Sequence, residues 1–403
     1  MGAAVNVRKM SASLLVTIER ILPGGVGLAH ADGKTVFVSL AAAGDKVRVS
    51  VDREQGNLLF ASIVEIIEPS PERIEPPCPY FGRCGGCDFQ QLTYEAQLKA
   101  KADIIRDCLH RIAHVELLQV SVVPSPTPWH YRARATWQLD PDQQTMGYYE
   151  RGSRRVCDVA ECAVLVPPLQ KTLEDVRSNQ FQNTTAELKH LDAVFGDGGV
   201  SLAPSFGRFQ TTELSLKVDE ETYSYNADAF FQVNQGLLTD LVHSALANAK
   251  GEAALDLYCG VGLFTLPLAR RFRKVVGVES NSVATRFARR NLQNARLSNA
   301  SIITASVADW IRSGSVKHGS FEFVLLDPPR AGAESAVIKG IVDLRPSRIV
   351  YVSCDPATLA RDLKKLIAQK FEVESVTGFD MFPQTHHVET VVHLVNKAVQ
   401  SAD

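Results

Sequence analysis

The sequence contains no run of about 18 or more apolar residues, so it predicts no membrane-spanning helix. Its 403 residues carry a formal net charge of only −2, so a nucleic-acid partner would have to bind a local basic patch. The apolar run that starts at Leu14 is broken at Glu19 and Arg20, which is not typical of a secretory signal peptide. These features, together with the lack of internal repeats, predict a globular cytoplasmic protein with no membrane partner.

Eight cysteines in a chain of this length, without a secretory signal, predict reduced thiols rather than a disulfide framework. Cys78, Cys84 and Cys87 lie close together, a spacing typical of metal or cluster ligands, with buried free thiols as the alternative. A fourth ligand would come from elsewhere, and the spacing does not separate Cys157 from Cys162. Zinc and a 4Fe–4S cluster both accept four thiolates, so these residues leave the metal open.

Short strands are predicted near the N-terminus. Residues 12–67 alternate polar and apolar positions, and glycine-containing turns separate the runs. The expected strands are Leu15–Ile18, Thr35–Leu40, Lys46–Val51 and Leu58–Ile67. Such a series of short strands indicates a small barrel, which either contacts nucleic acid or acts as a structural cap.

The pattern changes along the rest of the chain. Residues 93–113 have apolar positions at helical spacing, and Thr93 suits the N-cap. Residues 130–225 are irregular and rich in strands. Their arginines could contact phosphates or form a solvated basic face: Arg132, Arg134, Arg151, Arg154 and Arg155. From about residue 236 helices and strands alternate, which is typical of a parallel sheet with helices on both faces.

A glycine-containing turn, residues 258–262, follows the strand predicted over Ala253–Leu257. Its glycines let the backbone approach a ligand closely. The next strand ends in Glu279, nineteen residues after Gly260, which is about the spacing of an acid that binds ribose hydroxyls. Thr265 stands where a dinucleotide fingerprint has its third glycine. The pattern therefore favours an adenosyl cofactor without a pyrophosphate, such as S-adenosylmethionine.

Two reactive groups are predicted at the carboxyl ends of strands, where open parallel sheets bind ligands. The strand Phe321–Leu326 ends before Asp327, and the strand Arg348–Val352 ends just before Cys354. Cys354 also precedes a helix whose dipole would lower the thiol pKa, whereas Asp355 would raise it. The sequence does not decide between these effects, and a buried structural cysteine is the alternative.

A carboxylate is expected near this thiol. If the strand Glu372–Val376 is parallel to its predecessors, the strand Val388–Val395 returns antiparallel and starts at the same edge of the sheet. Glu389 would then lie beside the thiol, with His386 and His387 in the preceding loop as alternative bases.

A thiol, a base and a methyl donor together suit one reaction. C5 of uracil is a poor nucleophile, but addition of a thiolate at C6 makes an enolate whose C5 can attack a methyl sulfonium. A base then removes the C5 proton, and the thiol leaves by β-elimination. The sequence therefore predicts methylation of uracil at C5.

The chain resembles the RNA uracil-C5 methyltransferases, a family that contains enzymes forming 5-methyluridine in 23S rRNA and in tRNA. The resemblance covers nearly the whole chain and rests on CPYFGRCGGCDFQQLTYEAQLKAK (78–101), FFQVN (230–234), DLYCGVG (256–262), LLDPPRAG (325–332), SCDPATLARDL (353–363) and HVETVVHL (387–394). It implies an α/β fold: a class I methyltransferase doubly wound sheet, an N-terminal small β-barrel similar to TRAM or OB domains, and a central β-rich iron–sulfur domain.

The resemblance also assigns residues and boundaries. Cys354 is the expected nucleophile, and Glu389 is the expected base for the C5 proton. The resemblance implies a 4Fe–4S cluster on Cys78, Cys84, Cys87 and Cys162. S-adenosylmethionine is expected to contact Gln232, Tyr258, Glu279 and Asp327. The expected domains are a barrel at 1–70, a central iron–sulfur and RNA-binding domain at 71–92 and 125–230, and a methyltransferase domain at 93–124 and 231–403.

The expected partner is RNA, and the TRAM-like barrel favours 23S rRNA over tRNA. We expect a monomer. The target uracil would have to leave its stack to reach Cys354, and aromatic residues near the cysteines could stack on an unpaired base: Tyr80, Phe81 and Phe89. One rival is an enzyme that methylates an adenine amino group, but Arg330 stands where such sites usually have an aromatic residue. The other is an RNA-binding protein that has lost activity, against which the Cys354 and Glu389 pair counts.

Overall fold

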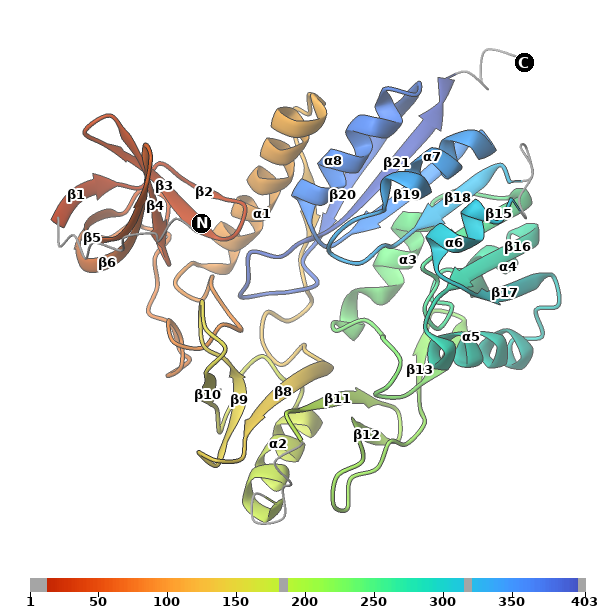
Figure 1. The fold of residues 1–403 in the computed structure, drawn as a ribbon, viewed down its shortest axis with the longest axis horizontal. Helices are drawn as coiled ribbons and strands as arrows, with labels where there is room; N and C mark the ends of the chain where they lie inside the picture. The colour runs from red at the N-terminus through yellow and green to blue at the C-terminus, as the bar shows by residue number, and fades with distance from the viewer. Residues whose placement is uncertain (1–12, 181–187, 315–320, 398–403) are drawn as a thin grey trace, which may run out of the picture.

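An eight-stranded sheet forms the centre of the C-terminal half, in the order β17-β16-β15-β18-β19-β21-β20-β7 (Figure 1). The computed structural model describes residues 13–180, 188–314 and 321–397. The strands of this sheet are β7 (Ser121–Val123), β15 (Gly251–Leu257), β16 (Phe272–Glu279), β17 (Ala300–Thr304), β18 (Phe323–Leu326), β19 (Arg348–Ser353), β20 (Phe371–Phe379) and β21 (Glu389–Asn396). Strands β15 to β19 run parallel, whereas β21 is antiparallel to both β19 and β20.

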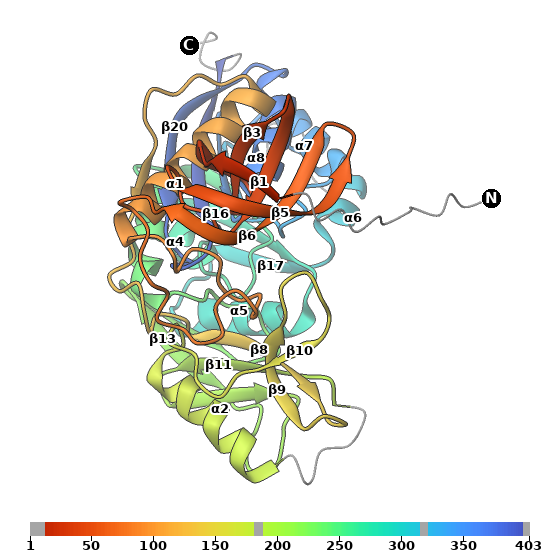
Figure 2. The ribbon, with the colours of Figure 1, turned by 90° about the vertical axis from the view of Figure 1, so that its left-hand side faces the viewer.

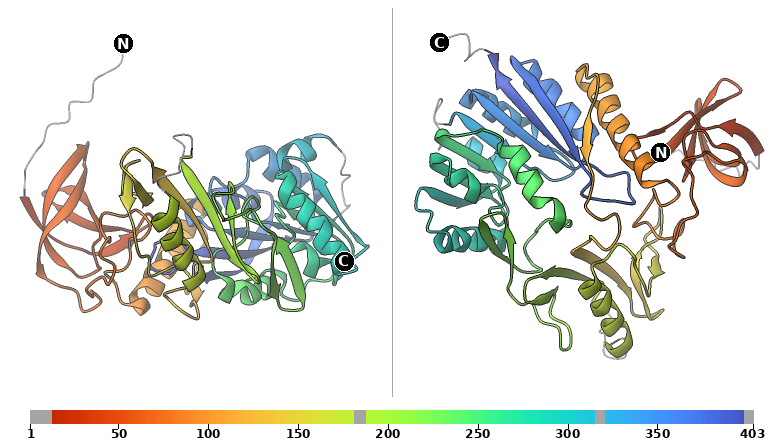
Figure 3. Two further views of the ribbon diagram at one scale, coloured as in Figure 1. Left: turned by 90° about the horizontal axis from the view of Figure 1, so that it is seen from below. Right: turned by 180° about the vertical axis from the view of Figure 1, so that it is seen from behind.

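Successive residues of the central strands feed two buried clusters, one on each face of the sheet. Ala254 belongs to the cluster under α3 (Leu238–Leu246), α4 (Thr265–Ala269) and α5 (Ser282–Asn294). Figure 3 (right) shows this side of the sheet from behind. Leu255 and Leu257 belong to the opposite cluster. That cluster is covered by α1 (Tyr94–Cys108), α6 (Val307–Arg312), α7 (Ser335–Leu344) and α8 (Pro356–Ile367). The predicted sheet with helices on both faces, and the antiparallel return of its last strand, are confirmed.

The N-terminal segment forms a separate, strongly curved sheet in the order β1-β5-β6-β4-β3-β2. Its strands are β1 (Ser13–Thr17), β2 (Arg20–Leu22), β3 (Val26–Ala31), β4 (Lys34–Ser39), β5 (Lys46–Gln55) and β6 (Leu58–Glu68). The sequence predicts four or five strands, whereas this sheet has six. The additional strands flank a Gly-Gly turn, and β3 is rich in glycine and alanine. The sheet packs beside α1 (Figure 2), where Ile21 and Ala42 join the cluster under that helix.

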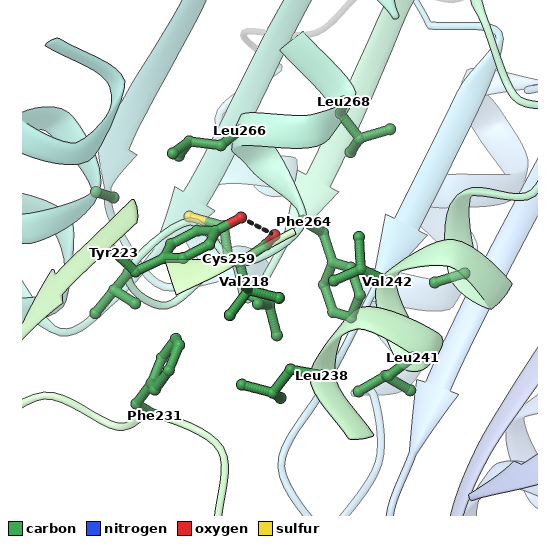
Figure 4. Packing of buried hydrophobic residues seen from close by; sticks show 14 of the residues in the cluster. Val218, Tyr223, Phe231, Leu238, Leu241, Val242, Cys259, Phe264, Leu266 and Leu268 are labelled. Atoms are coloured by element: carbon green, nitrogen blue, oxygen red, sulfur yellow. Dashed lines mark hydrogen bonds between the residues drawn. The ribbon is translucent and has the colours of Figure 1, made fainter. Parts of the chain in front are cut away.

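A third sheet, in the order β10-β9-β8-β11-β12, occupies the middle of the chain. It consists of β8 (Arg134–Asp140), β9 (Thr145–Tyr149), β10 (Val156–Asp158), β11 (His190–Gly196) and β12 (Gly199–Ala203), and it shares a core with α2 (Pro167–Gln180). A hairpin, β13 (Leu214–Val218) and β14 (Glu221–Tyr225), connects it to the large sheet. Figure 4 shows Tyr223 of this hairpin donating a hydrogen bond to the Leu263 carbonyl at 2.9 Å. The hairpin thereby holds the segment next to the glycine turn.

Helix α1 fixes the loop that precedes β21. Thr93 is its N-cap, as predicted, and accepts a hydrogen bond from the Ala96 N–H. Lys101, on the buried side of α1, forms an ion pair with Asp380, and both side chains are fully buried. The Tyr94 hydroxyl donates to the same carboxylate at 2.8 Å, and Gln97 bonds with Gln384 at 3.0 Å. The start of β21 is therefore held from the helix side. Among the described residues, no helix is both long and apolar enough to cross a membrane.

We predict that Lys101→Met destabilises the protein by about 3–5 kcal/mol, because it leaves the Asp380 carboxylate buried without its cationic partner. Arg106→Met is the matched control, since it breaks an exposed ion pair with Asp103 on the same helix and should cost at most about 1 kcal/mol. Urea unfolding followed by circular dichroism measures both. Equal unfolding midpoints for the two variants would contradict this account of the loop.

Candidate active site

The pairing of β19 with β21 determines where Cys354 and Glu389 lie relative to each other. The ladder ends with Ser353 opposite Thr390, so the next residues on the two strands are Cys354 and Glu389. Opposed side chains of antiparallel strands share a face, with Cβ atoms about 4.5–5.5 Å apart. The structure thus brings together the thiol and the carboxylate that the sequence predicts to act as a pair.

The two carboxyl groups at this edge bind their protons tightly. Glu389 is only 3% exposed; burial and then the charge of Asp327 raise its pKa well above the usual value, while Arg330 opposes them. Burial raises the pKa of Asp327 to about 7. A carboxylate that has lost hydration is a stronger base than an exposed one, which suits removal of a proton from carbon.

Burial also governs the Cys354 thiol. It raises the pKa of Cys354 to about 12, with Glu389 acting in the same direction and the adjacent Arg330 guanidinium in the opposite one. Helix α8 begins at Pro356 with Asp355 as its N-cap, and the carboxylate accepts from the N–H groups of Ala357 and Thr358. From the sequence alone, the helix dipole would lower the pKa of the Cys354 thiol and Asp355 would raise it. In the structure, burial and then the charge of Glu389 are the main causes of the raised pKa.

The two histidines are weaker candidates for the base. His386 is engaged by Asp88, whose carboxylate lies 2.5 Å from the ring Nδ1 and accepts from the backbone N–H at 2.8 Å. Burial, followed by His386 and Arg330, lowers the pKa of His387 to about 3. An imidazole with so low a pKa holds a proton poorly. Glu389 therefore fits the role better than either histidine.

Arg330 is a site residue to which the sequence analysis gave no function. It lies beside the Cys354 thiol, where its charge favours the thiolate, and it also favours ionised Glu389. Its place after the turn Asp327-Pro328-Pro329 was the available signal. An arginine after a turn is more often a solvated charge, so the sequence alone does not reveal the contact.

A cleft beside this edge is lined by three of the four predicted cofactor contacts, Gln232, Tyr258 and Asp327. The Gln232 amide lies 3.5 Å from the Asp327 carboxylate. Glu279, the fourth, is not part of the lining. Its carboxylate accepts from the Gly260 N–H at 3.1 Å and from the Asn281 N–H at 2.7 Å. Glu279 therefore stabilises the glycine turn through its hydrogen bond with the Gly260 N–H in this structure.

The turn itself exposes backbone toward the cleft. Tyr258 has a φ of +63° and Gly260 a φ of +54°. A left-handed tyrosine is a strained conformation of the kind that collects at functional sites. A Cβ at Gly260 would meet no atom within 4 Å, so the turn presents bare backbone to open space. The predicted close approach of a ligand is compatible with this geometry.

Asp256, at the end of β15, is a second group that the sequence analysis left without a role. It is fully buried, and Thr265 donates a hydrogen bond to it at 2.5 Å. Burial raises its pKa to about 7, and the nearby Asp327 and Glu279 act in the same direction. Thr265, the residue in place of a third glycine, thus provides a hydrogen bond to a buried carboxyl group next to the turn.

The cysteine loop forms a second, separate site. Cys78, Cys84, Cys87 and Cys162 line one cavity against the central sheet. Cys157 is not part of that lining, and its sulfur lies 3.3 Å from the Arg83 Nε donor. Within the described ranges, no three His, Cys, Asp or Glu side chains are arranged to hold a single metal ion. The structure thus places the fourth thiol of the cavity at Cys162.

One shielded polar atom in the wall of this cavity, Arg132 Nε, has no hydrogen-bond partner. Arg134 donates to the carbonyls of Ala227 and Ala229, and Phe89 is fully buried. The hypothesis that Phe89 stacks on a base is therefore wrong. Phosphate contacts by Arg132 and Arg134, which are both partly exposed, stay predictions.

Known proteins with the same architecture identify the family. A family model described as tRNA (uracil-5-)-methyltransferase matches residues 206–397. The chain is 33% identical to the 23S rRNA (uracil(1939)-C(5))-methyltransferase RlmD of Pectobacterium atrosepticum. The alignment, 429 positions long with its gaps, covers 96% of this chain and 95% of that protein. It is 34% identical to RlmD of Pseudomonas putida, with coverages of 93% and 92%.

The chain belongs to the RNA uracil-C5 methyltransferase family. A solved structure agrees with this assignment: the Pyrococcus abyssi tRNA (uracil-54, C5)-methyltransferase in complex with S-adenosyl-L-homocysteine. It superposes with a TM-score of 0.75 at 26% identity and covers 94% of this chain and 99% of that chain. The protein is thus a methyltransferase of the S-adenosylmethionine-dependent class, and its large sheet has the class I methyltransferase-like fold that the motifs imply.

We predict that alkylation of Cys354 in the free methyltransferase rises about tenfold per pH unit between about pH 7 and pH 10. The reason is that only the thiolate reacts, and a pKa of about 12 keeps the thiolate a small fraction that grows as pH approaches the pKa. Iodoacetamide labelling with mass spectrometry of the Cys354 peptide measures the rate. A plateau near pH 8.5, the ordinary value for a thiol, would contradict the effect of burial.

Proposed function

We propose that the methyltransferase forms 5-methyluridine through a covalent bond between Cys354 Sγ and C6 of the target uracil, with Glu389 removing the C5 proton. The single observation that carries the proposal is the position of Cys354 and Glu389 at the end of the β19 and β21 ladder. A ring held between them would present C6 to the sulfur and C5 to the carboxylate.

The chain's own groups account for each step of the reaction. The Cys354 thiol first loses its proton to solvent, and Arg330 stabilises the resulting thiolate. The thiolate adds to C6 and moves the electron pair of the C5–C6 double bond toward C5. S-adenosylmethionine, when bound, supplies the methyl group to C5 as an electrophile. Glu389 then takes the C5 proton, the double bond reforms, and the sulfur leaves with its electron pair. The buried, poorly hydrated Glu389 carboxylate is suited to this transfer.

The proposed cofactor contacts are Gln232, Tyr258, Glu279 and Asp327. The acidic cleft between Gln232 and Asp327 suits a ligand that carries a sulfonium and an ammonium group. The P. abyssi relative contains S-adenosyl-L-homocysteine, which supports an adenosyl ligand in the corresponding fold. Glu279 would act on the ribose hydroxyls after exchanging part of its hydrogen bonding to the turn.

We further propose that Cys78, Cys84, Cys87 and Cys162 hold a 4Fe–4S cluster, which would tie the cysteine loop to the central sheet. The four thiols line one cavity, and the unpaired Arg132 Nε in its wall needs an anionic neighbour. Thiolates bound to a cluster would supply that charge. Four thiolates could also hold a single zinc ion, so metal analysis of the purified protein decides between the two.

The proposed RNA is 23S rRNA, because the relatives from Pectobacterium atrosepticum and Pseudomonas putida, at 33% and 34% identity over nearly the whole chain, are named as 23S rRNA enzymes. tRNA is the second candidate, because the family model and the P. abyssi structure carry tRNA names. We assign the barrel at 1–70 as a TRAM-like domain. The segments 71–92 and 125–230 form the central iron–sulfur and RNA-binding domain, and 93–124 with 231–403 form the methyltransferase domain.

Glu389→Gln is expected to accumulate an SDS-stable protein–RNA adduct, because the methylated intermediate cannot lose its C5 proton. Gel electrophoresis with labelled RNA detects it. The control, Glu389→Gln combined with Cys354→Ala, should form neither adduct nor product. If Glu389→Gln turns over like the wild type, or if Cys354→Ala still makes 5-methyluridine, the proposed chemistry fails.

Cys162→Ala should lose most of the bound iron and sulfide, whereas Cys157→Ala, a matched change at the excluded thiol, should retain both. Iron and sulfide analysis of anaerobically purified protein, together with its visible absorbance, measures the cluster directly. Loss in the Cys157 variant with retention in the Cys162 variant would reverse the assignment, and zinc in place of iron would overturn the cluster.

Deletion of the gene should remove one 5-methyluridine from 23S rRNA and leave tRNA unchanged. Mass mapping of nuclease digests of both RNAs provides the measurement. Loss from tRNA alone would select the second candidate, and unchanged modification in both RNAs would contradict the assigned substrate class.

A further inference from the structure

A groove with a volume of about 470 Å³ lies where the barrel, the cysteine loop and the loop before β21 meet. Its walls include Gly24 of the barrel, Asp88 after the cysteine loop, Tyr149 at the end of β9, Arg151 just beyond it, and His386. Its size is within the range of about 300–1,000 Å³ that is typical of ligand sites. It is distinct from the cleft beside the glycine turn, with which it shares no lining residue.

The walls of the groove include an exposed aromatic residue and an arginine. Tyr149 is 43% exposed. Arg151 donates through Nη2 to the Cys87 carbonyl at 3.1 Å, while its shielded Nε has no partner. An exposed aromatic ring beside an arginine is the combination by which proteins hold an unpaired base.

The acidic groups of the walls are already neutralised. Glu150 forms an ion pair with Arg155 at 2.5 Å, and Asp88 binds His386 at 2.5 Å. Arg151 therefore lines the groove beside carboxylates that already have other partners. Gly24, with a φ of +87°, would place a Cβ in open space, so this wall consists of bare backbone that a ligand can approach closely.

The groove connects directly to the catalytic edge. The His386 ring lies 4.1 Å from the His387 ring. The charge of Arg330 contributes to the lowered pKa of His387, and Arg330 is also adjacent to the Cys354 thiol. One RNA chain could therefore occupy both places, with nucleotides that are close in sequence.

We propose that this groove binds one unpaired nucleotide of the RNA substrate, a near neighbour of the target uridine, with its base against Tyr149 and Arg151. This proposal rests on the proposed function and extends it by naming a second RNA subsite. It also gives the cysteine loop a role in a reaction without net electron transfer, because Gly85 and Gly86 of that loop form part of the wall.

Binding of a fluorescein-labelled oligouridine of about 12 nucleotides tests the groove without relying on methylation. We expect Arg151→Met and Gly24→Asn to weaken binding at least about fivefold, as loss of an RNA contact does. Arg154→Met is a matched control outside the groove. Gly33→Asn is the second control, because Gly33 has a φ of +73° and equally open surroundings but does not line the groove.

Iron content shows whether Arg151→Met disturbs the cysteine loop. If it does, the comparison of Gly24→Asn with Gly33→Asn still tests the groove. Fluorescence anisotropy supplies the dissociation constants. Equal affinities within each matched pair would overturn the proposal. An adduct in Glu389→Gln together with equal affinities would remove only this subsite, whereas unequal affinities without an adduct would leave the subsite and remove the proposed chemistry.

A scan of abasic substitutions around the target uridine locates the bound nucleotide. In the wild type, one flanking abasic position should raise KM with little change in kcat. In Tyr149→Leu the same position should have no further effect, because stacking is already lost. Additive effects at every position would contradict a base held against Tyr149.

Discussion

The antiparallel insertion of β21 between β19 and β20 is the constraint on which the site depends. If β21 ran parallel, its first residue would lie at the opposite end of the sheet, and Glu389 would be separated from Cys354 by the full strand length. Antiparallel pairing places both at the edge where Asp327 and Tyr258 also end their strands. A shift of one residue in this register would turn Glu389 to the other face.

The register is reinforced from three directions around the loop 380–388. Helix α1 holds it through Lys101 and Asp380, the cysteine segment holds it through Asp88 and His386, and Val388 is buried in the core. The N-terminal third of the chain is therefore coupled to the catalytic edge by buried charges rather than by a linker. The burial that fixes these residues also raises the pKa values of Cys354 and Glu389. The site therefore withholds water from the groups whose protons must move.

The sequence predicted the large sheet well because its strands alternate with helices and end in reactive residues. Its antiparallel last strand and the edge shared by Cys354 and Glu389 followed from that pattern. The two short strands around Gly24 and Gly25 were missed because glycine and alanine carry little strand signal. The place of Arg132 in the wall of the cysteine cavity was not predicted, because it depends on how the central sheet meets the cysteine loop. Lys101, Asp256 and Arg330 lacked a role because their partners are distant in sequence, and only the folded chain brings them together.

The central claim is that sulfur 354 bonds to the pyrimidine before the methylated product is released. RNA in which 5-fluorouridine replaces the target uridine tests it directly, because fluorine at C5 cannot be removed as a proton. Incubation with S-adenosylmethionine followed by proteolysis and mass spectrometry should give one peptide, that of Cys354, carrying a methylated fluorouridine nucleotide. A complex that dissociates in denaturant, or an adduct on any other cysteine, would contradict the account.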